Sequence, residues 1–315
     1  MKIIELGNSP ERPLPCVATI GFFDGVHLGH RYIIDKVMET SRQRQMASAV
    51  VTFARHPRQV LQPGWHPQLL STLDEKTALL SATGIDQLVV LPFDGEMARL
   101  SARDFMAQVL RRQLGVTILV TGYDNHFGHR TAGVAEGFDD YVGYGRELGM
   151  TVVRGDAFDA DTIRVSSSKV RLMLHNGDVE LAALCLGRPY ELSGRVVSGD
   201  HIGTGMGFPT ANMQPSDADK QIPALGAYAV KVCVDGEPEL HGMMNIGRRP
   251  TFDGDHLTLE TNIFHFDGNL YGRQMTVRFI SRLRPELKFN SSEALAAQLV
   301  EDSRRAEEIL NKKIV

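Results

Sequence analysis

Short apolar runs alternate with amphipathic stretches over the first half of the chain. Helical spacing of apolar residues runs through residues 30–43 and 134–148, a polar helix is predicted over residues 74–81, and Ser101 is a suitable N-cap for another helix. The apolar runs, each short enough for one buried strand, are residues 16–20, 47–53, 87–93, 116–120 and 151–154. Because continuous apolar strands that alternate with helices are typical of a parallel sheet covered on both faces, we predict an α/β domain here.

The pattern changes in the second half of the chain. Two short helices are predicted, and Gly177 and Gly187 are suitable C-terminal stops for them. Five or six β-rich segments follow, separated by Gly, Pro, Asp and Asn, which favours an antiparallel barrel. A final amphipathic helix places Leu295, Leu299 and Ile309 on one face. We place the boundary near Leu186 and predict two domains, residues 1–185 and 186–315.

Composition narrows the possible partners. The 315 residues carry a formal net charge of −4, and basic and acidic residues are spread evenly over both halves. Neither half therefore has the basic surplus that a sequence-unspecific nucleic-acid-binding protein needs, which leaves only a local basic pocket as an alternative. No apolar run is long enough to span a membrane, and the N-terminal residues do not resemble a signal peptide. The three cysteines lie too far apart for a metal knuckle and are too few for a disulfide framework, so we expect buried thiols and a cytoplasmic protein.

Ligands of parallel sheets bind beyond the carboxyl ends of the strands, which here means just after Ile20, Phe53 and Thr121. The segment GFFDGVHLGH lies at the first of these positions and carries His27 and His30 on either side of Gly29. Its glycines allow the backbone to approach a ligand, and the following helix offers free N–H groups to an anion. Two imidazoles there can stabilise charge at a nucleotide α-phosphate. A bare glycine turn and a metal pair are the alternatives.

Two more segments of the first half have phosphate-binding composition. The loop GYDNHFGHRTAG directly follows Thr121 and carries three glycines, two histidines and Arg130. This composition suits a nucleotide or flavin cradle, although a surface loop is the alternative. In RVSSSKVR, three serines precede a helix whose first turn holds Lys169 and Arg171. Serine hydroxyls and these cations can hold phosphate, but serine is also common at an ordinary helix cap.

The second half carries its own candidates. Five glycines lie within residues 194–213, but no Lys-Ser/Thr pair follows them, so this is not a P-loop. Thr210 and Asn212 are oxygen donors two residues apart and suit Mg²⁺ beside phosphate, unless they belong to an incidental turn. Glu260 lies in an otherwise apolar strand and is either a surface residue or a buried general base.

These segments together resemble the bacterial bifunctional riboflavin kinase/FMN adenylyltransferase (FAD synthetase) family over essentially the whole chain. The resemblance implies an N-terminal Rossmann-like nucleotidyltransferase domain with a parallel sheet and a C-terminal antiparallel β-barrel kinase domain with a terminal helix. It rests on GFFDGVHLGH, VVTFARHPRQVL, LPFDGEMARLSARDF, TGYDNHFGHRTAG and VSSSKVRLMLHNGDVELAALCLGRPY, and then on GFPTAN, GAYAV, GMMNIGRRPTF and LETNIFHFDGNLYG.

In the first domain the resemblance implies that the FMN phosphate attacks the α-phosphorus of ATP and that pyrophosphate leaves. Two changes from the family pattern, Ala54 and Arg55, precede the flavin-side His-Pro element. The implied flavin-side residues are His56, Pro57 and Phe127. The implied ATP-binding residues are Gly21, Phe23, Asp24, His27, Gly29, His30, Asp124, Ser167, Ser168 and Arg171, with the two histidines catalytic.

In the second domain the resemblance implies that Thr210 and Asn212 hold Mg²⁺ and ATP. Glu260 is then the base that takes the proton from the ribityl 5′-hydroxyl of riboflavin. His265 stands where the family has an aspartate, which we interpret as a loop variation. The ATP-binding residues implied for this domain are Gly203, Gly205, Gly207, Thr210 and Asn212.

The expected ligands are therefore riboflavin, FMN, FAD and ATP with Mg²⁺, and we expect no nucleic-acid or membrane partner and a monomer or weak homo-oligomer. The alternative is a single-function nucleotidyltransferase whose barrel senses flavin. A cytidylyltransferase shares the H-x-G-H pattern but does not explain the match over the whole chain. A tRNA synthetase is disfavoured because the chain has no Lys-Met-Ser-Lys-Ser stretch and no basic domain.

Overall fold

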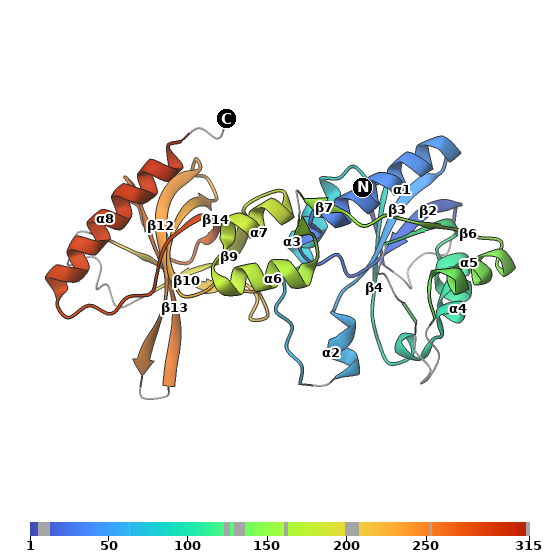
Figure 1. Cartoon of the computed structure of the whole chain (residues 1–315), viewed down its shortest axis with the longest axis horizontal. Coiled ribbons are helices and arrows are strands. Elements are labelled where there is room, and N and C mark those ends of the chain that lie inside the picture. Colours follow the sequence, from blue (N-terminus) through green and yellow to red (C-terminus); the bar gives the residue numbers. More distant parts are fainter. Residues whose placement is uncertain are drawn as a thin grey trace. The chain divides into compact units, whose positions relative to one another are not determined.

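The computed structural model describes residues 1–5, 13–62, 64–122, 127–128, 136–160, 163–198, 208–251 and 254–312. The chain forms two compact units, Met1–Ser166 and Ser167–Val315 (Figure 1). Each unit has its own sheet and its own hydrophobic core.

The first unit is built on a six-stranded sheet in which every pair of neighbouring strands is parallel. The strand order is β1-β4-β3-β2-β5-β6, so β2 lies between β3 and β5 and the chain switches direction across the sheet at β2. This is the position at which open α/β sheets bind ligands. The strands are β1 (Lys2–Glu5), β2 (Cys16–Ile20), β3 (Ala47–Phe53), β4 (Gln87–Leu91), β5 (Val116–Thr121) and β6 (Thr151–Arg154).

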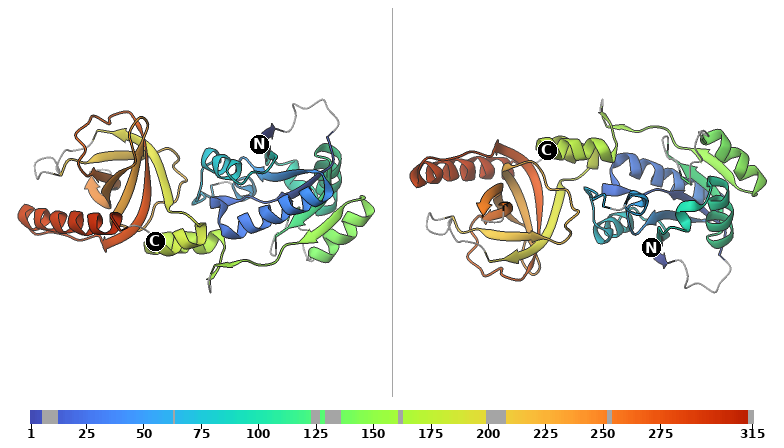
Figure 2. Two further views of the ribbon diagram at one scale, coloured as in Figure 1. Left: turned by 90° about the horizontal axis from the view of Figure 1, so that it is seen from above. Right: turned by 90° about the horizontal axis from the view of Figure 1, so that it is seen from below.

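Helices cover both faces of this sheet (Figure 2). One face packs against Phe105, Met106 and Tyr141, and the other against Ile34 and Leu80. The helical segments are η1 (Asp24–Val26), α1 (Leu28–Arg44), α2 (Pro57–Leu61), α3 (Leu73–Ser81), η2 (Met97–Arg99), α4 (Ala102–Phe105), the π-helical η3 (Met106–Gln113) and α5 (Phe138–Glu147). The short hairpin of β7 (Asp159–Ala160) and β8 (Ile163–Arg164) completes the unit. The predicted α/β domain is confirmed, and β1 is a strand that the sequence pattern missed.

The second unit is a closed antiparallel barrel of six strands in the order β10-β13-β12-β11-β14-β9. Large apolar side chains such as Tyr228, Phe279 and Leu259 fill its core. Helix α8 (Ser292–Leu310) lies along the outside of the barrel, as Figure 2 shows, and it packs on Ala227 and Met243. The strands are β9 (Tyr190–Val197), β10 (Ala211–Pro215), β11 (Gly226–Val234), β12 (Leu240–Thr251), β13 (Gly254–Ile263) and β14 (Gln274–Pro285).

Two short helices, α6 (Ser167–Asn176) and α7 (Val179–Leu186), group with the barrel. The Ala224 N–H donates to the Leu174 carbonyl at 2.9 Å, and the Ser281 hydroxyl donates to Glu180 at 2.5 Å. The boundary between the two compact units thus lies after Ser166, whereas the boundary predicted from the sequence lies after residue 185. The predicted boundary stays a prediction.

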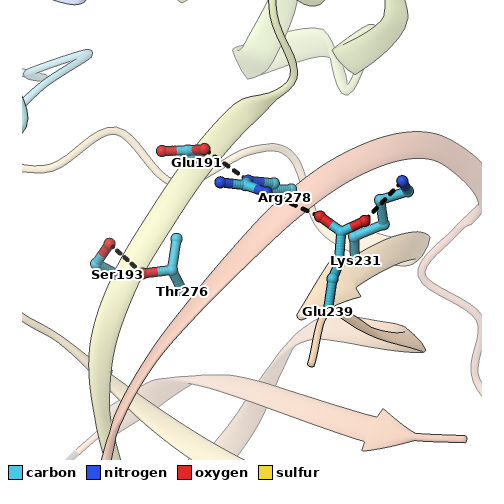
Figure 3. Close-up of polar contacts among 6 residues, drawn as sticks. All are labelled: Glu191, Ser193, Lys231, Glu239, Thr276 and Arg278. Atoms are coloured by element: carbon cyan, nitrogen blue, oxygen red, sulfur yellow. Dashed lines mark hydrogen bonds and ion pairs between the residues drawn. The ribbon is translucent and has the colours of Figure 1, made fainter. Parts of the chain in front are cut away.

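Charged side chains on the outer face of the barrel are paired across strands (Figure 3). Arg278 donates to Glu191 and to Glu239, both at 2.8 Å, and Lys231 donates to Glu239 at 2.8 Å. The Lys231 and Arg278 side chains hold the pKa of Glu239 below its usual value. These groups are about one-third exposed, so the network contributes modestly to stability.

All three cysteines are free. Cys16 and Cys185 are buried, as predicted, and burial raises the pKa of Cys16 to about 11. Cys233 is only half-buried, so the prediction of a buried thiol is wrong there. It points outward from β11, as do Ala227 and Ala229, because residues two apart on a strand share a face.

Candidate active sites

The turn that follows β2 has unusual backbone geometry. Phe23, Gly25 and Val26 all have positive φ, at 53°, 76° and 39°. Left-handed backbone is rare for a β-branched residue such as valine, and it costs free energy. The surrounding structure must therefore hold the turn in place.

Asp24 provides much of that support. Its Oδ1 accepts hydrogen bonds from the backbone N–H groups of Leu70 at 2.9 Å and Ser71 at 3.1 Å, and the side chain is buried. The Ser71 hydroxyl accepts in turn from the Gly25 N–H at 2.9 Å. Asp24 thus links the turn to the segment that leads into α3. Its predicted contact with ATP stays a prediction.

The two histidines lie together at the start of α1. His27 is the N-cap, and its Nδ1 accepts a hydrogen bond from the His30 backbone N–H at 3.2 Å. The two rings are stacked, with centroids 3.5 Å apart and planes 15° apart. Because Nδ1 is an acceptor, the proton of a neutral His27 is on Nε2. Gly29 leaves room for the His27 ring, since a Cβ there would lie 3.2 Å from Nδ1 of His27.

Electrostatics keep the second histidine neutral. Burial lowers the pKa of His30 well below its usual value, and the nearby His27 and Lys76 lower it further. Its Nδ1 is buried and has no hydrogen-bond partner among the residues that the structure describes. The H-x-G-H turn therefore offers the neutral imidazole of His30 and the ring of His27, together with the first amides of a helix.

The second predicted turn, after β3, lies beside the first. His56 caps α2, accepting from the Arg58 N–H at 3.1 Å, and Pro57 is the first helical residue. The His56 ring contacts Phe22 edge-on, with centroids 4.6 Å apart, and lies 4.9 Å from the Trp65 ring. The structure thus brings His56 and Pro57 next to the H-x-G-H turn.

Other predicted residues of the first site are placed differently. Phe127 is half-buried and stacks on Tyr141, with centroids 4.5 Å apart, so its ring is part of the core packing. Ser167, Ser168 and Arg171 are in the first two turns of α6, which groups with the second unit. Their roles in ATP binding stay predictions. Asp124 lies outside the described residues, as do Gly203, Gly205 and Gly207.

The segment that leads into α6 nevertheless passes the histidine turn. The Val165 carbonyl oxygen lies 3.7 Å from a Cβ built on Gly29, and both residues are in the first unit. The three serines of the RVSSSKVR segment follow directly after Val165 in the chain.

In the second unit, Glu260 lies in the middle of a polar row across three strands. It is directly opposite Asn212 on β10 and directly opposite Asn245 on β12. Directly opposite residues of antiparallel strands share a face. The neighbours of Glu260 on β13, Leu259 and Thr261, are buried in the barrel, so the row is on the outer face. Sequence reasoning missed Asn245, whose only signal is an amide inside the apolar run GMMNIG.

Glu260 lines a cavity of about 260 Å³ between the outer face of the barrel and α8. Phe208, Met243, Phe289 and Leu299 provide apolar walls. The two sequence alternatives for Glu260 are thus both partly right: it points away from the barrel core, yet it lines a cavity and is half-buried.

Thr210 lines this cavity and also a second one of about 340 Å³. The second cavity is bordered by Pro209, Ala211 and the loop of residues 266–271. The Asn262 side chain donates to the Pro209 carbonyl at 2.8 Å, which ties the GFPTAN segment to β13. Thr210 therefore lies between the two cavities.

Helix α8 is fixed to the barrel by a buried ion pair that sequence reasoning also missed. Arg284 and Asp302 are 2.8 Å apart, and the Asp302 side chain is 1% exposed. Farther along α8, Glu307 contacts His265 at 3.2 Å. His265 has a positive φ of 54° and follows the end of β13, which fits the predicted loop variation.

Across the described ranges, no three His, Cys, Asp or Glu side chains gather as a metal-binding cluster. The metal-pair alternative for His27 and His30 thus has no third ligand of these types among those residues. In the second unit, Thr210, Asn212 and Glu260 supply the oxygen donors that Mg²⁺ prefers. None of the helices that the structure describes is long and apolar enough to cross a membrane.

Comparison with known proteins agrees with this two-site arrangement. Residues 9–169 match the model of the FAD synthetase family, and residues 186–310 match that of the riboflavin kinase family. Bifunctional riboflavin kinase/FMN adenylyltransferases from Pseudomonas fluorescens and Escherichia coli K12 are 38% and 37% identical, covering 91% and 98% of this chain and 90% and 97% of theirs. A solved Streptococcus pneumoniae structure, described as a macrolide-efflux protein, is 29% identical with a TM-score of 0.86 over 99% of both chains. The chain belongs to the bifunctional riboflavin kinase/FMN adenylyltransferase family.

Proposed function

We propose that the chain phosphorylates riboflavin to FMN on the outer face of its barrel and adenylylates FMN to FAD at the H-x-G-H turn, using ATP in both steps. The observation that carries this proposal is that each unit has its own polar site. The first is at the switch point of the parallel sheet, and the second is the cavity that contains Glu260.

In the adenylylation step, a phosphate oxygen of FMN attacks the α-phosphorus of ATP, and the bond to pyrophosphate breaks. Nε2–H of His27 and the neutral ring of His30 hydrogen-bond the phosphate oxygens as negative charge grows. The backbone amides at the start of α1 add a favourable dipole. His56 and Pro57 are proposed to contact FMN, because their turn adjoins the histidine turn. No covalent intermediate with the enzyme is needed, so positioning carries much of the rate.

In the phosphorylation step, Glu260 accepts the proton of the ribityl 5′-hydroxyl as its oxygen attacks the γ-phosphorus, and ADP leaves. The apolar walls of the Glu260 cavity suit a flavin ring, and Thr210 directs the nucleotide toward the second cavity. Thr210 and Asn212 would hold Mg²⁺, which neutralises charge on the ATP phosphates.

We further propose a cytoplasmic protein that is a monomer or a weak homo-oligomer. Three free cysteines, two of them buried, suit a reducing compartment.

The test is product analysis with riboflavin, ATP and Mg²⁺. The parent chain should form FMN and then FAD. His27→Ala with His30→Ala should accumulate FMN, because only the first site is lost, and the loss of one such donor costs on the order of 10²–10³ in rate. If the parent converts added FMN but never phosphorylates riboflavin, the barrel is a flavin sensor and the proposal is wrong.

A further inference from the structure

A buried lysine lies beneath the adenylylation site and has no role in the chemistry described above. Lys76 is in the first turns of α3, and its side chain is only 2% exposed. Its Nζ donates hydrogen bonds to the carbonyl of Phe22 at 3.1 Å and to the carbonyl of Phe53 at 3.0 Å. The same nitrogen lies 4.1 Å from the centre of the Phe22 ring.

The two carbonyls belong to the two turns of the site. Phe22 follows β2 and leads into the H-x-G-H turn, whereas Phe53 ends β3, three residues before His56. The Phe22 carbonyl also accepts from the Thr52 hydroxyl at 3.1 Å. One ammonium group therefore connects the start of the ATP-side turn to the start of the flavin-side turn. The ring of Phe22 extends that connection, because it contacts His56.

The helix that carries Lys76 is itself held against the site. Thr72 and Glu75 form a reciprocal cap at the start of α3. The two residues before this cap, Leu70 and Ser71, donate to Asp24. The helix cap and the contacts with Asp24 therefore hold the start of α3, and with it the ammonium group of Lys76, in place.

Burial of a lysine is costly. Desolvation lowers the pKa of Lys76 to about 8, and the charge of Asp24 offsets only part of that effect. An apolar side chain of similar length would avoid the desolvation cost, but it would remove a donor from both carbonyls and leave that of Phe22 with only the Thr52 hydroxyl as a side-chain donor. Lys76 thus supplies hydrogen-bond donors at this position rather than stability.

We propose that Lys76 is a positioning residue for adenylyl transfer: its hydrogen bonds to the Phe22 and Phe53 carbonyls fix the spacing between the H-x-G-H turn and the His56–Pro57 turn. This inference rests on the proposed function of the first site. Each turn can bind its own substrate without Lys76, but the attacking phosphate and the α-phosphorus are then misaligned. Such misalignment lowers the rate more than it lowers binding.

The experiment compares three substitutions in the full chain. Lys76→Met keeps the length but donates nothing, and Lys76→Gln restores an N–H donor without charge. The matched control is Ser48→Ala, because Ser48 is also buried on β3 and exchanges hydrogen bonds with Asp86 near the amino end of the strand, away from the site. Circular dichroism gives the folded fraction, so that every rate is expressed per folded molecule.

Lys76→Met should lower kcat for FMN adenylylation by about 10- to 100-fold with KM values for ATP and FMN within a few-fold of the parent. Lys76→Gln should recover part of this loss, and Ser48→Ala should stay within about threefold of the parent. Riboflavin phosphorylation should be unchanged in all three proteins. FAD formation by the parent checks the proposed function separately.

If the parent forms FAD and Lys76→Met matches Ser48→Ala, the inference about Lys76 is overturned. If Lys76→Met does not fold, Lys76→Gln carries the test at a temperature at which it is fully folded. A kcat equal to that of Ser48→Ala then overturns the inference, and a selective loss of adenylylation supports it.

Discussion

Replacement of Gly29 by alanine should separate the stability of the first unit from its activity. A Cβ at this position would lie 3.2 Å and 3.3 Å from two atoms of the His27 ring and 3.7 Å from the Val165 carbonyl. The first two distances are too short for an ordinary contact, so the ring must move by a few tenths of an ångström. That movement disturbs both the stack on His30 and the hydrogen bond to its N–H.

The two effects on stability oppose each other. Alanine in place of glycine favours a helix by up to about 1 kcal/mol, and disturbance of the His27 cap costs about as much. The free energy of unfolding should therefore change by less than about 1 kcal/mol. FMN adenylylation should fall by at least about tenfold, because a hydrogen-bond donor to the developing charge is displaced.

The matched control is Gly143→Ala in α5. A Cβ there meets nothing within 4 Å, so the substitution should stabilise the helix and leave both activities unchanged. Urea unfolding and the steady-state kinetics of FAD formation are measured for both variants. Adenylylation by Gly29→Ala at the parent rate would show that the arrangement of the two histidine rings does not matter, and it would refute the reasoning.

Three further outcomes are expected. Thr210→Ala or Asn212→Ala should raise KM for Mg²⁺–ATP in riboflavin phosphorylation by about tenfold, because a lost bond to a charged group costs roughly 1.5 kcal/mol or more. The same variants should still convert FMN to FAD, and parallel kinetics of the two steps check both expectations. The folded-state pKa of His30 is well below its usual value, so below pH 6.5 the unfolded chain binds the extra proton and stability falls by up to about 1.4 kcal/mol per pH unit. In unfolding titrations His30→Gln should remove that slope, and an unchanged slope would contradict the burial of a neutral ring. Asp302→Ala leaves the largely buried Arg284 without its partner and should destabilise the barrel unit by about 3 kcal/mol in denaturant unfolding.

The location of the first site could be predicted from the sequence, because it depends on local patterns. Apolar runs that alternate with helices determine a parallel sheet, and H-x-G-H follows the strand at which the sheet order switches. The caps also follow from local chemistry: Ser101 accepts from the Asp104 N–H, and both Gly177 and Gly187 adopt positive φ at helix ends.

Lys76 shows what the sequence did not reveal. A lysine near the start of a helix of mixed polarity is usually exposed, so residues 74–81 were predicted only as a polar helix. Its burial depends on the packing of α3 against Phe22, just after β2, and Phe53, the last residue of β3, which lie 54 and 23 residues away. Local periodicity carries no information on such distant contacts.

The second site shows a related limit. Alternation along β13 indicates that Glu260 and Leu259 point in opposite directions, but not which direction faces a cavity. That depends on where α8 packs, and the helix is held by a pair between Arg284 and Asp302. The outer face of a barrel strand is usually exposed, and here a helix partly covers it.

The most direct test of two separate sites is Glu260→Gln, which keeps the size and polarity of the side chain but cannot accept the hydroxyl proton. Glu239→Gln is the matched control, because Glu239 is a carboxylate in the ion-pair network outside the Glu260 cavity. Steady-state kinetics are measured for riboflavin phosphorylation and for FMN adenylylation. We expect Glu260→Gln to lower riboflavin phosphorylation by at least about 100-fold and to leave FMN adenylylation intact, with Glu239→Gln like the parent in both. An unchanged rate of riboflavin phosphorylation, or the loss of both activities in a folded protein, would contradict the account.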